Sequence, residues 1–496
     1  MNVFTLIFYF YSLLFISKGS TPNKAIDAKT IYNSTFTSES LRKYVDTTVE
    51  PCDNFYNFAC GNWIKDKKSA NRYLIGNFDY RPTRQNFKSF IEGNIFYVFI
   101  YLLLETRYHS VRGESPVVDK IIELRDLCVG IDPFDAIGDC ERVVIEFGTY
   151  ALSTLFIKRN RKNSEERNDY IVLDDMIKRI KEEFILLIDE RQDTFDELSI
   201  DNIFLKFTNM TFSIKSDDFG LTNVTLMEEC YKNIGINYND TIENIVNAIK
   251  HQQSITKSDD KMWFCREKIF KPAEYLNFHV YSSAKYHSKY NKIYISSDTL
   301  AEPSFSIKFP SALNYGYLGF TFAQAILDAF DTKTINHNYD NFDSEEGKKS
   351  VVSEESMNHM IAISTCFTQE WFKQRETINH RDVDNILTTD RKIVDNAGLK
   401  IAYEAYRNFV RSFGKEYIVV PGFEQYTEDQ LFFIGFGRHF CEYTSEDSYV
   451  PHNGKPGDIL SEIRTNSILK NYHEFSNTFY CSYNNKLMYT KTCKVW

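Results

Sequence analysis

Apolar positions recur with helical spacing along most of this chain. The pattern predicts helices within residues 85–128 and at 170–190, 240–252, 356–376, 394–416 and 427–440. Aromatic and β-branched composition predicts strands at 278–282 and 292–296, with a further strand at the start of 212–221. Loops or extended chain are predicted for the polar stretches 21–44, 158–169 and 332–355. This distribution predicts a mainly α fold with a small β-sheet.

The segment that begins at Gly319 is predicted to be the central helix. Its apolar side chains form one stripe, made by Phe320, Ala323, Ile326, Leu327 and Phe330. Gln324, Asp328 and Asp331 are spaced i, i+4 and i+7, so they share another face. In the motif His-Glu-x-x-His, the two histidines at i and i+4 lie on one face of a helix and bind zinc in a cleft. Here the three motif positions hold Gln324, Ala325 and Asp328.

Four blocks of sequence carry a further signal. They read Pro51-Cys-Asp-Asn-Phe-Tyr-Asn-Phe-Ala-Cys-Gly-Asn-Trp63, then Asn314-Tyr-Gly-Tyr-Leu-Gly319 ahead of the central helix, Val394-Asp-Asn-Ala-Gly-Leu-Lys-Ile-Ala-Tyr-Glu-Ala-Tyr406 and Cys493-Lys-Val-Trp496. In this order they resemble the neprilysin-like family of zinc metallopeptidases. The resemblance is clear over residues 45–90 and 275–496.

The resemblance implies a zincin-type lobe and a reduced helical lobe. Residues 45–90 and 270–496 would form the metallopeptidase-like lobe, and 91–269 the helical lobe that caps it. Residues 1–19 hold an apolar run of the length of a secretory signal, followed by a polar segment at 20–44. The chain is therefore expected to be secreted, and a short uncleaved anchor in the plasma membrane is the alternative.

The positions that would bind zinc in the family hold other residues here. The resemblance assigns the three ligand positions to Gln324, Asp328 and Arg391, and the general base to Ala325. A catalytic zinc needs three protein donors and an open position for water. Arginine stays protonated and has no lone pair to donate. No zinc or other cofactor, and no catalytic residue, is therefore expected.

Two carboxylates of the family's site are retained. Asp331 and Asp395 match aspartates that, in the family, support the zinc ligands. With no histidine to orient, both need another partner, because an unpaired buried carboxylate is costly. We predict that Arg391 fills the metal position and pairs with Asp328, Asp395 or both; the alternative is that Arg391 points to solvent.

The substrate-binding positions implied by the resemblance have also changed. The edge strand that hydrogen-bonds the substrate backbone aligns with Phe278-His-Val-Tyr281, where only the tyrosine remains. The histidine that steadies the oxyanion aligns with Gly454, and the arginine that grips the substrate carbonyl aligns with Leu460.

Composition excludes some functions. The net charge of −10 and the pI of about 5.6 argue against nucleic acid and against an electrostatic membrane patch. Contact with a membrane is expected only if the N-terminal segment is uncleaved. The ten cysteines predict an oxidising compartment.

The resemblance also suggests disulfide pairs. Independently of it, the sequence contains four glycosylation sequons. The suggested pairs are Cys52–Cys481, Cys60–Cys441, Cys366–Cys493 and Cys128–Cys265, which leaves Cys140–Cys230. Sequons that predict a glycosylated surface occur at Asn33, Asn209, Asn223 and Asn239.

Together these features predict a secreted, catalytically inactive homologue of neprilysin-like metalloendopeptidases. It would act by binding peptides, or by binding a partner such as an active family member. The alternative from another class is residual or altered metalloendopeptidase activity on extracellular peptides. A structural or storage glycoprotein is a third possibility.

Overall fold

The structure is a computed structural model of the 496-residue chain. It describes residues 32–71, 79–80, 86–87, 90, 112–129, 137–214, 220–232, 240–258, 263–269, 272–281, 283–336, 350–375, 386–444, 461–489 and 493. The predicted signal or anchor at 1–19 lies outside these residues. No helix in the described part is long and apolar enough to cross a membrane.

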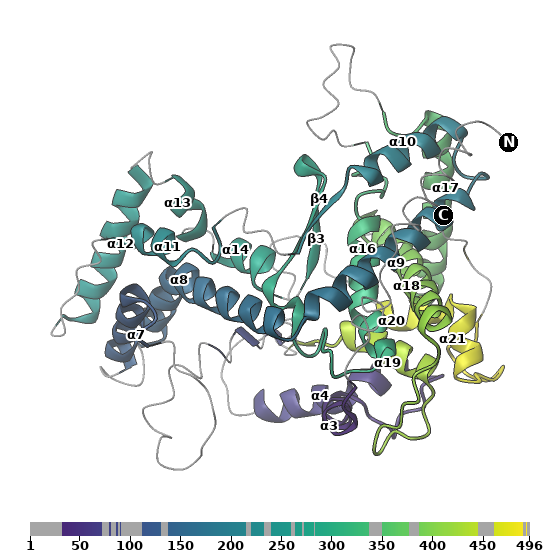
Figure 1. Cartoon of the computed structure of the whole chain (residues 1–496), viewed down its shortest axis with the longest axis horizontal. Helices are drawn as coiled ribbons and strands as arrows, with labels where there is room; N and C mark the ends of the chain where they lie inside the picture. Colours follow the sequence, from purple (N-terminus) through teal and green to yellow (C-terminus); the bar gives the residue numbers. More distant parts are fainter. Residues whose placement is uncertain are drawn as a thin grey trace.

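The described helices surround two hydrophobic cores (Figure 1). The larger core takes side chains from α3 (Ser34–Tyr44), α4 (Phe55–Asn71), α9 (Asp169–Asp189), α10 (Glu197–Thr208), α16 (Phe320–Leu327), α17 (Glu354–Arg375), α18 (Ile386–Phe413), α19 (Glu428–His439), α20 (Ser461–Lys470) and α21 (His473–Thr478). The smaller core is built by α7 (Pro116–Val129), α8 (Ile137–Glu166), α11 (Val224–Cys230), α12 (Ile242–Ser258), α13 (Trp263–Ile269) and α14 (Pro272–His279). The mainly α fold with a small sheet is confirmed.

A small mixed sheet lies between α14 and α16 (Figure 1). Its strand order is β2 (Thr211–Ser213), β4 (Lys292–Ile295), β3 (Ala284–His287), with β2 parallel and β3 antiparallel to β4. A two-residue pair, β1 (Asp79–Tyr80) with β5 (Tyr443–Thr444), forms a second sheet. In the larger sheet β3 is an edge strand.

The central helix is positioned by a close crossing with α19. Before it come α15 (Ser311–Asn314) and a π-helical turn at Tyr315–Gly319. A Cβ on Gly316 would lie 2.0 Å from the carbonyl oxygen of Phe432, and one on Gly435 would lie 2.5 Å from that of Leu313. Only glycine fits at these two positions, because the backbones themselves are in contact. The glycine of Asn314-Tyr-Gly therefore sets the direction in which α16 leaves the crossing.

Three local predictions are wrong. Residues 158–166 continue α8, because their Lys, Arg and Glu side chains favour a helix as much as a loop and Ser164 is buried. Residues 34–44 form α3, which Asn33 caps by accepting from Phe36 N at 2.9 Å and which buries Leu41 and Tyr44. Phe278 and His279 end the helix α14 instead of forming a strand.

Three of the suggested disulfides are present, namely Cys52–Cys481, Cys60–Cys441 and Cys366–Cys493. The pairings Cys128–Cys265 and Cys140–Cys230 are wrong, because Cys230 bonds to Cys265. α11 and α13 both pack on α8 and bring these two cysteines together, which a sequence pattern does not reveal. The side chains of Cys128 and Cys140 lie outside the described residues. The bridges fit an oxidising, extracellular compartment.

Three of the four sequon asparagines lie in the described part and are exposed. They are Asn33, Asn209 and Asn223, while Asn239 lies outside it. Asn223 caps α11 by accepting from Leu226 N at 3.0 Å.

Candidate functional site

The central helix places the motif positions at the interface with α18. Gln324 and Ala325 are buried on α16, and Asp328 follows at the C-terminal end of that helix. α18 packs across them, and a Cβ on Gly398 would lie 3.3 Å from the ring of Phe320 and 3.4 Å from Gln324. The small residue there lets the two helices approach, so α18 carries Arg391 and Asp395 to the same place.

Asp395 is the buried centre of this site. Its side chain is 1% exposed, and its Oδ1 accepts from Gln324 Nε2 at 2.5 Å. Arg464 of α20 donates from Nε to Oδ2 at 2.5 Å and from Nη2 to Oδ1 at 2.7 Å. Burial opposes ionisation, but the charges of Arg464 and Arg391 outweigh it and hold the pKa of Asp395 below its usual value. Asp395 is thus a fully paired carboxylate.

Arg391 pairs with both aspartates, as predicted. Its Nη1 donates to Asp328 Oδ1 at 2.7 Å, and its Nε lies 4.0 Å from Asp395 Oδ1. The charge of Asp328 raises the pKa of Arg391 above its ordinary value, so the guanidinium stays charged. The side chains of Arg391 and Asp328 are 42% and 30% exposed, so this half of the site is open to solvent.

We call Gln324, Asp328, Arg391, Asp395 and Arg464 the arginine–carboxylate cluster. Its two guanidinium groups balance its two carboxylates, so a dication would add uncompensated positive charge. The donors do not fit zinc either, since Asp328 and Asp395 are engaged by arginine and Gln324 offers only a weak amide oxygen. At the positions that the resemblance assigns to the zinc ligands, the structure forms a self-compensated ion-pair network.

Arg464 was missed by the sequence analysis. The resemblance assigned the corresponding role to Leu460, which lies outside the described residues together with Gly454. Arg464 reaches the cluster from the first turn of α20 and also stacks on Phe440 at 4.9 Å. No local pattern marks it, because its carboxylate partner Asp395 is 69 residues away in the chain.

His439 lies beside Phe440, the ring on which Arg464 stacks, in an aromatic environment. His439 Nδ1 lies 3.2 Å from Thr321 Oγ1, and the ring contacts Tyr317, Phe320 and Phe440 edge-on. Burial, and then the charge of Arg464, lower the pKa of His439 to about 3. It therefore stays neutral and packs as a structural residue.

The turn after α16 is fixed by two charged side chains. Asp331 accepts from Lys333 N at 2.9 Å and from Thr334 N at 2.7 Å, so it stabilises a turn. Lys206 of α10, which is 1% exposed, donates to the carbonyl oxygens of Ala329, Thr334 and Ile335, at 2.7, 2.9 and 3.0 Å. This ammonium group closes the C-terminal end of the central helix, where carbonyl groups lack partners.

The edge strand of the site differs from the predicted one. Phe278 and Tyr281 belong to the end of α14 and the turn after it, and the strand is β3, beginning at Ala284. A hairpin signal was available in the sequence, since Lys292-Ile-Tyr-Ile follows β3 after a short turn at Asn291, whose φ is +44°. β3 therefore replaces Phe278–Tyr281 as the strand beside the central helix.

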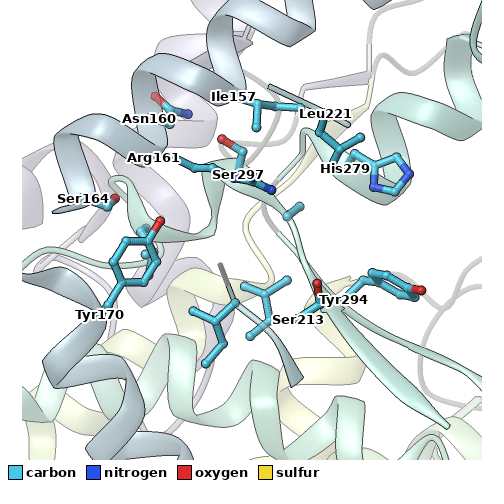
Figure 2. Close-up of a pocket in the computed structure, with 14 residues that line it drawn as sticks. Ile157, Asn160, Arg161, Ser164, Tyr170, Ser213, Leu221, His279, Tyr294 and Ser297 are labelled. Carbon is cyan, nitrogen blue, oxygen red and sulfur yellow. The ribbon is translucent and has the colours of Figure 1, made fainter. Parts of the chain in front are cut away.

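A separate small cavity lies between α8 and the sheet (Figure 2). Asn160, Arg161 and Ser164 line it from α8, and Tyr294 and Ser297 line it from β4 and the turn after it. Its volume is about 30 Å³, which is enough for roughly one water molecule. None of its lining residues belongs to the arginine–carboxylate cluster, and the cavity is too small to hold a peptide.

The fold is that of a zincin-type metallopeptidase lobe. Residues 283–495 match the model of Peptidase family M13. The chain is 27% identical to human neprilysin over 328 residues, which are 66% of this chain and 42% of that protein. It is 30% identical to rat endothelin-converting enzyme 1 over 216 residues, 43% of this chain and 27% of that protein. The chain is thus similar to the neprilysin-like peptidases over its C-terminal part, and it spans less than half the length of these relatives.

Solved structures agree on the fold. A chain of the Haemonchus galactose containing glycoprotein complex is similar with a TM-score of 0.58 and 14% identity, over 93% of this chain and 98% of that one. The Mycobacterium tuberculosis zinc metalloprotease Zmp1 is similar with a TM-score of 0.52 and 18% identity, over 75% of this chain and 52% of that one.

Proposed function

We propose that this chain is a secreted, catalytically inactive homologue of the neprilysin-like metalloendopeptidases that acts by binding extended peptide segments. One observation carries the proposal. Two guanidinium groups, from Arg391 and Arg464, stand among Gln324, Asp328 and Asp395, where the family's activity requires metal-binding donors. A general base is also missing, because Ala325 has no titratable group.

An edge strand that could bind a peptide backbone is present. β3 is an edge strand, and such a strand can add an extended segment through main-chain hydrogen bonds. It runs beside α16, and the cluster there is open to solvent through Arg391 and Asp328 (Figure 1). The ligand would be a free peptide or a strand-forming segment of a partner protein, such as an active family member or a component of a glycoprotein assembly.

Metal content and cleavage test the loss of catalysis. We expect protein purified with added zinc and then desalted to hold far less than one zinc per chain by mass spectrometry of the metal. We expect no cleavage of a mixed set of fluorogenic peptides, with an active neprilysin-like enzyme as the positive control. One zinc per chain, removed by a chelator together with peptide cleavage, would overturn the proposal in favour of residual or altered endopeptidase activity.

A further inference from the structure

A second cavity lies beside α3 and α4 and shares no lining residue with the arginine–carboxylate cluster. Its volume is about 490 Å³, within the range of about 300–1,000 Å³ that is usual for small-ligand sites. The C-terminal end of α3 and one face of α4 form two walls, and Asn86 with the turn Glu302–Pro303 forms the third. The two helices pack against each other (Figure 1). We call this space the α3–α4 cavity.

The acidic side chains of the cavity are each paired with a lysine. Lys43 Nζ lies 3.6 Å from Glu302 Oε1, and Lys67 Nζ lies 3.0 Å from Asp66 Oδ2. An ammonium group has more donors, and a carboxylate more acceptor sites, than one such pair uses. A charged ligand group would compete with these pairs. A hydroxyl group both donates and accepts, so it can bond to both members of a pair without separating them.

Two asparagines of the cavity have unused carbonyl oxygens. Asn62 Nδ2 donates to two backbone carbonyls at the C-terminal end of α3, at 2.6 and 3.3 Å. Asn86 Nδ2 donates to the buried carboxyl group of Asp298 at 3.0 Å and to the backbone carbonyl of Glu302 at 2.9 Å. Neither Oδ1 accepts a hydrogen bond from the described part of the chain. Both oxygens therefore suit a ligand that donates, and they disfavour a phosphate or sulfate group, which only accepts.

The helical walls also contribute two aromatic rings. Tyr44 and Trp63 are stacked, with ring centroids 6.4 Å apart and 7° between their planes. Both side chains line the cavity but are largely buried, so only their edges reach it. Lys67 Nζ lies 5.8 Å from the centroid of the Trp63 ring. The cavity thus combines a small apolar area with many polar groups, and recognition there depends mainly on hydrogen bonds.

We propose that the α3–α4 cavity binds a neutral saccharide, as a single sugar or as the end of a glycan. A sugar carries hydroxyl groups around its ring and C–H groups on its faces, which matches paired charges and amide oxygens beside aromatic edges. Arg42, Lys43 and Lys67 face two carboxylates across the lining, an excess of only one positive charge. This inference goes beyond the proposed function and does not depend on it, because it concerns other residues and another class of ligand.

An array of immobilised neutral, sialylated and sulfated oligosaccharides tests the class of ligand. We expect a neutral glycan to give the strongest signal. Saturation-transfer NMR with the same glycan free in solution should then show contacts to its ring protons. Its Kd should change less than about twofold between roughly 0.05 and 0.5 M sodium chloride, since a neutral ligand leaves little for salt to screen.

Three variants locate the glycan. Lys67→Met should weaken binding about tenfold or more, because a hydrogen bond to a charged group is lost. Asp66→Trp, at a side chain that is 70% exposed on the rim, should block the cavity and abolish binding. Lys178→Met removes an exposed lysine of α9 outside the cavity and serves as the control, with a change below about twofold. Circular dichroism checks that each variant is folded.

Three results would overturn the inference. Stronger binding of sialylated or sulfated glycans, lost at high salt, would overturn the neutral class. Neutral glycan binding that survives both Lys67→Met and Asp66→Trp would place the sugar elsewhere and overturn the assignment of the cavity. Absence of any glycan signal, on the array and in NMR, would overturn the inference entirely. None of these results touches the zinc and cleavage assays, so a failure here is distinct from a failure of the proposed function.

Discussion

Removal of Arg464 tests whether the arginine–carboxylate cluster is a compensated network. Arg464→Met keeps most of the side-chain volume but leaves Asp395, which is 1% exposed, with only Gln324 and the more distant Arg391. Breaking a buried pair by removing one partner costs about 3–5 kcal/mol, because a buried charge is left uncompensated. With two remaining partners we expect a loss at the lower end, about 3 kcal/mol.

Arg391→Met is the matched comparison within the same cluster. Its main partner Asp328 is 30% exposed and Arg391 itself is 42% exposed, so solvent screens this pair. We expect a loss of about 1 kcal/mol, close to the value for exposed pairs. The measurement is the shift of the thermal unfolding midpoint with disulfides intact, and the expected order is a larger shift for Arg464→Met. Lys178→Met, which removes an exposed pair with Glu182, should shift the midpoint least.

Two further measurements can refute this reasoning. Adding Asp395→Asn to Arg464→Met should restore most of the lost stability, because the uncompensated charge is then gone. In the Arg464→Met variant the pKa of Asp395 should rise above its unfolded value, so the loss should shrink as pH falls through that pKa toward the unfolded one. If Arg464→Met were no more damaging than Arg391→Met, or if Asp395→Asn made it worse, the compensation argument would fail.

Two other predictions concern the positioning of the central helix. Gly316→Ala should destabilise the protein by several kcal/mol and lower the yield of folded protein, since the added Cβ would meet the Phe432 carbonyl oxygen at 2.0 Å. Gly319→Ala is the control: its added Cβ would have its nearest neighbour at 3.4 Å, so it should be neutral or slightly stabilising in thermal unfolding. Lys206→Met should destabilise the protein by about 2 kcal/mol or more, because three carbonyl groups lose their donor. Burial lowers the pKa of Lys206 to about 8, so the unfolded chain binds more protons than the folded protein above that pH. The wild type should therefore gain stability relative to Lys206→Met as pH rises from about 8 to about 10.5. Parallel stability–pH profiles of the two proteins would contradict this.

Much of the fold could be predicted from the sequence because long amphipathic patterns are local. α9, α17 and α19 were expected within about two residues of their bounds, whereas α12 ends about six residues later and α18 begins about eight residues earlier than expected. The charged end of α8 and the polar helix α3 were missed, because a charged run has the same composition in a loop and on an exposed helix face. Strand β3 was misplaced by a few residues, since short strands carry too few positions to fix their bounds.

The sequence by itself led to the assignment of Gln324 and Asp328 to metal-ligand positions, because the motif spacing on one helix fixes a shared face without any knowledge of packing. It also led to the prediction that Arg391 would pair with Asp328 or Asp395, since both carboxylates needed compensation. Only the tertiary structure decided that Arg464 is the main partner of Asp395 and that β3 forms the edge beside the cluster. Those contacts join segments far apart in the chain, and their partners are selected by how α16, α18 and α20 pack, which no local pattern encodes.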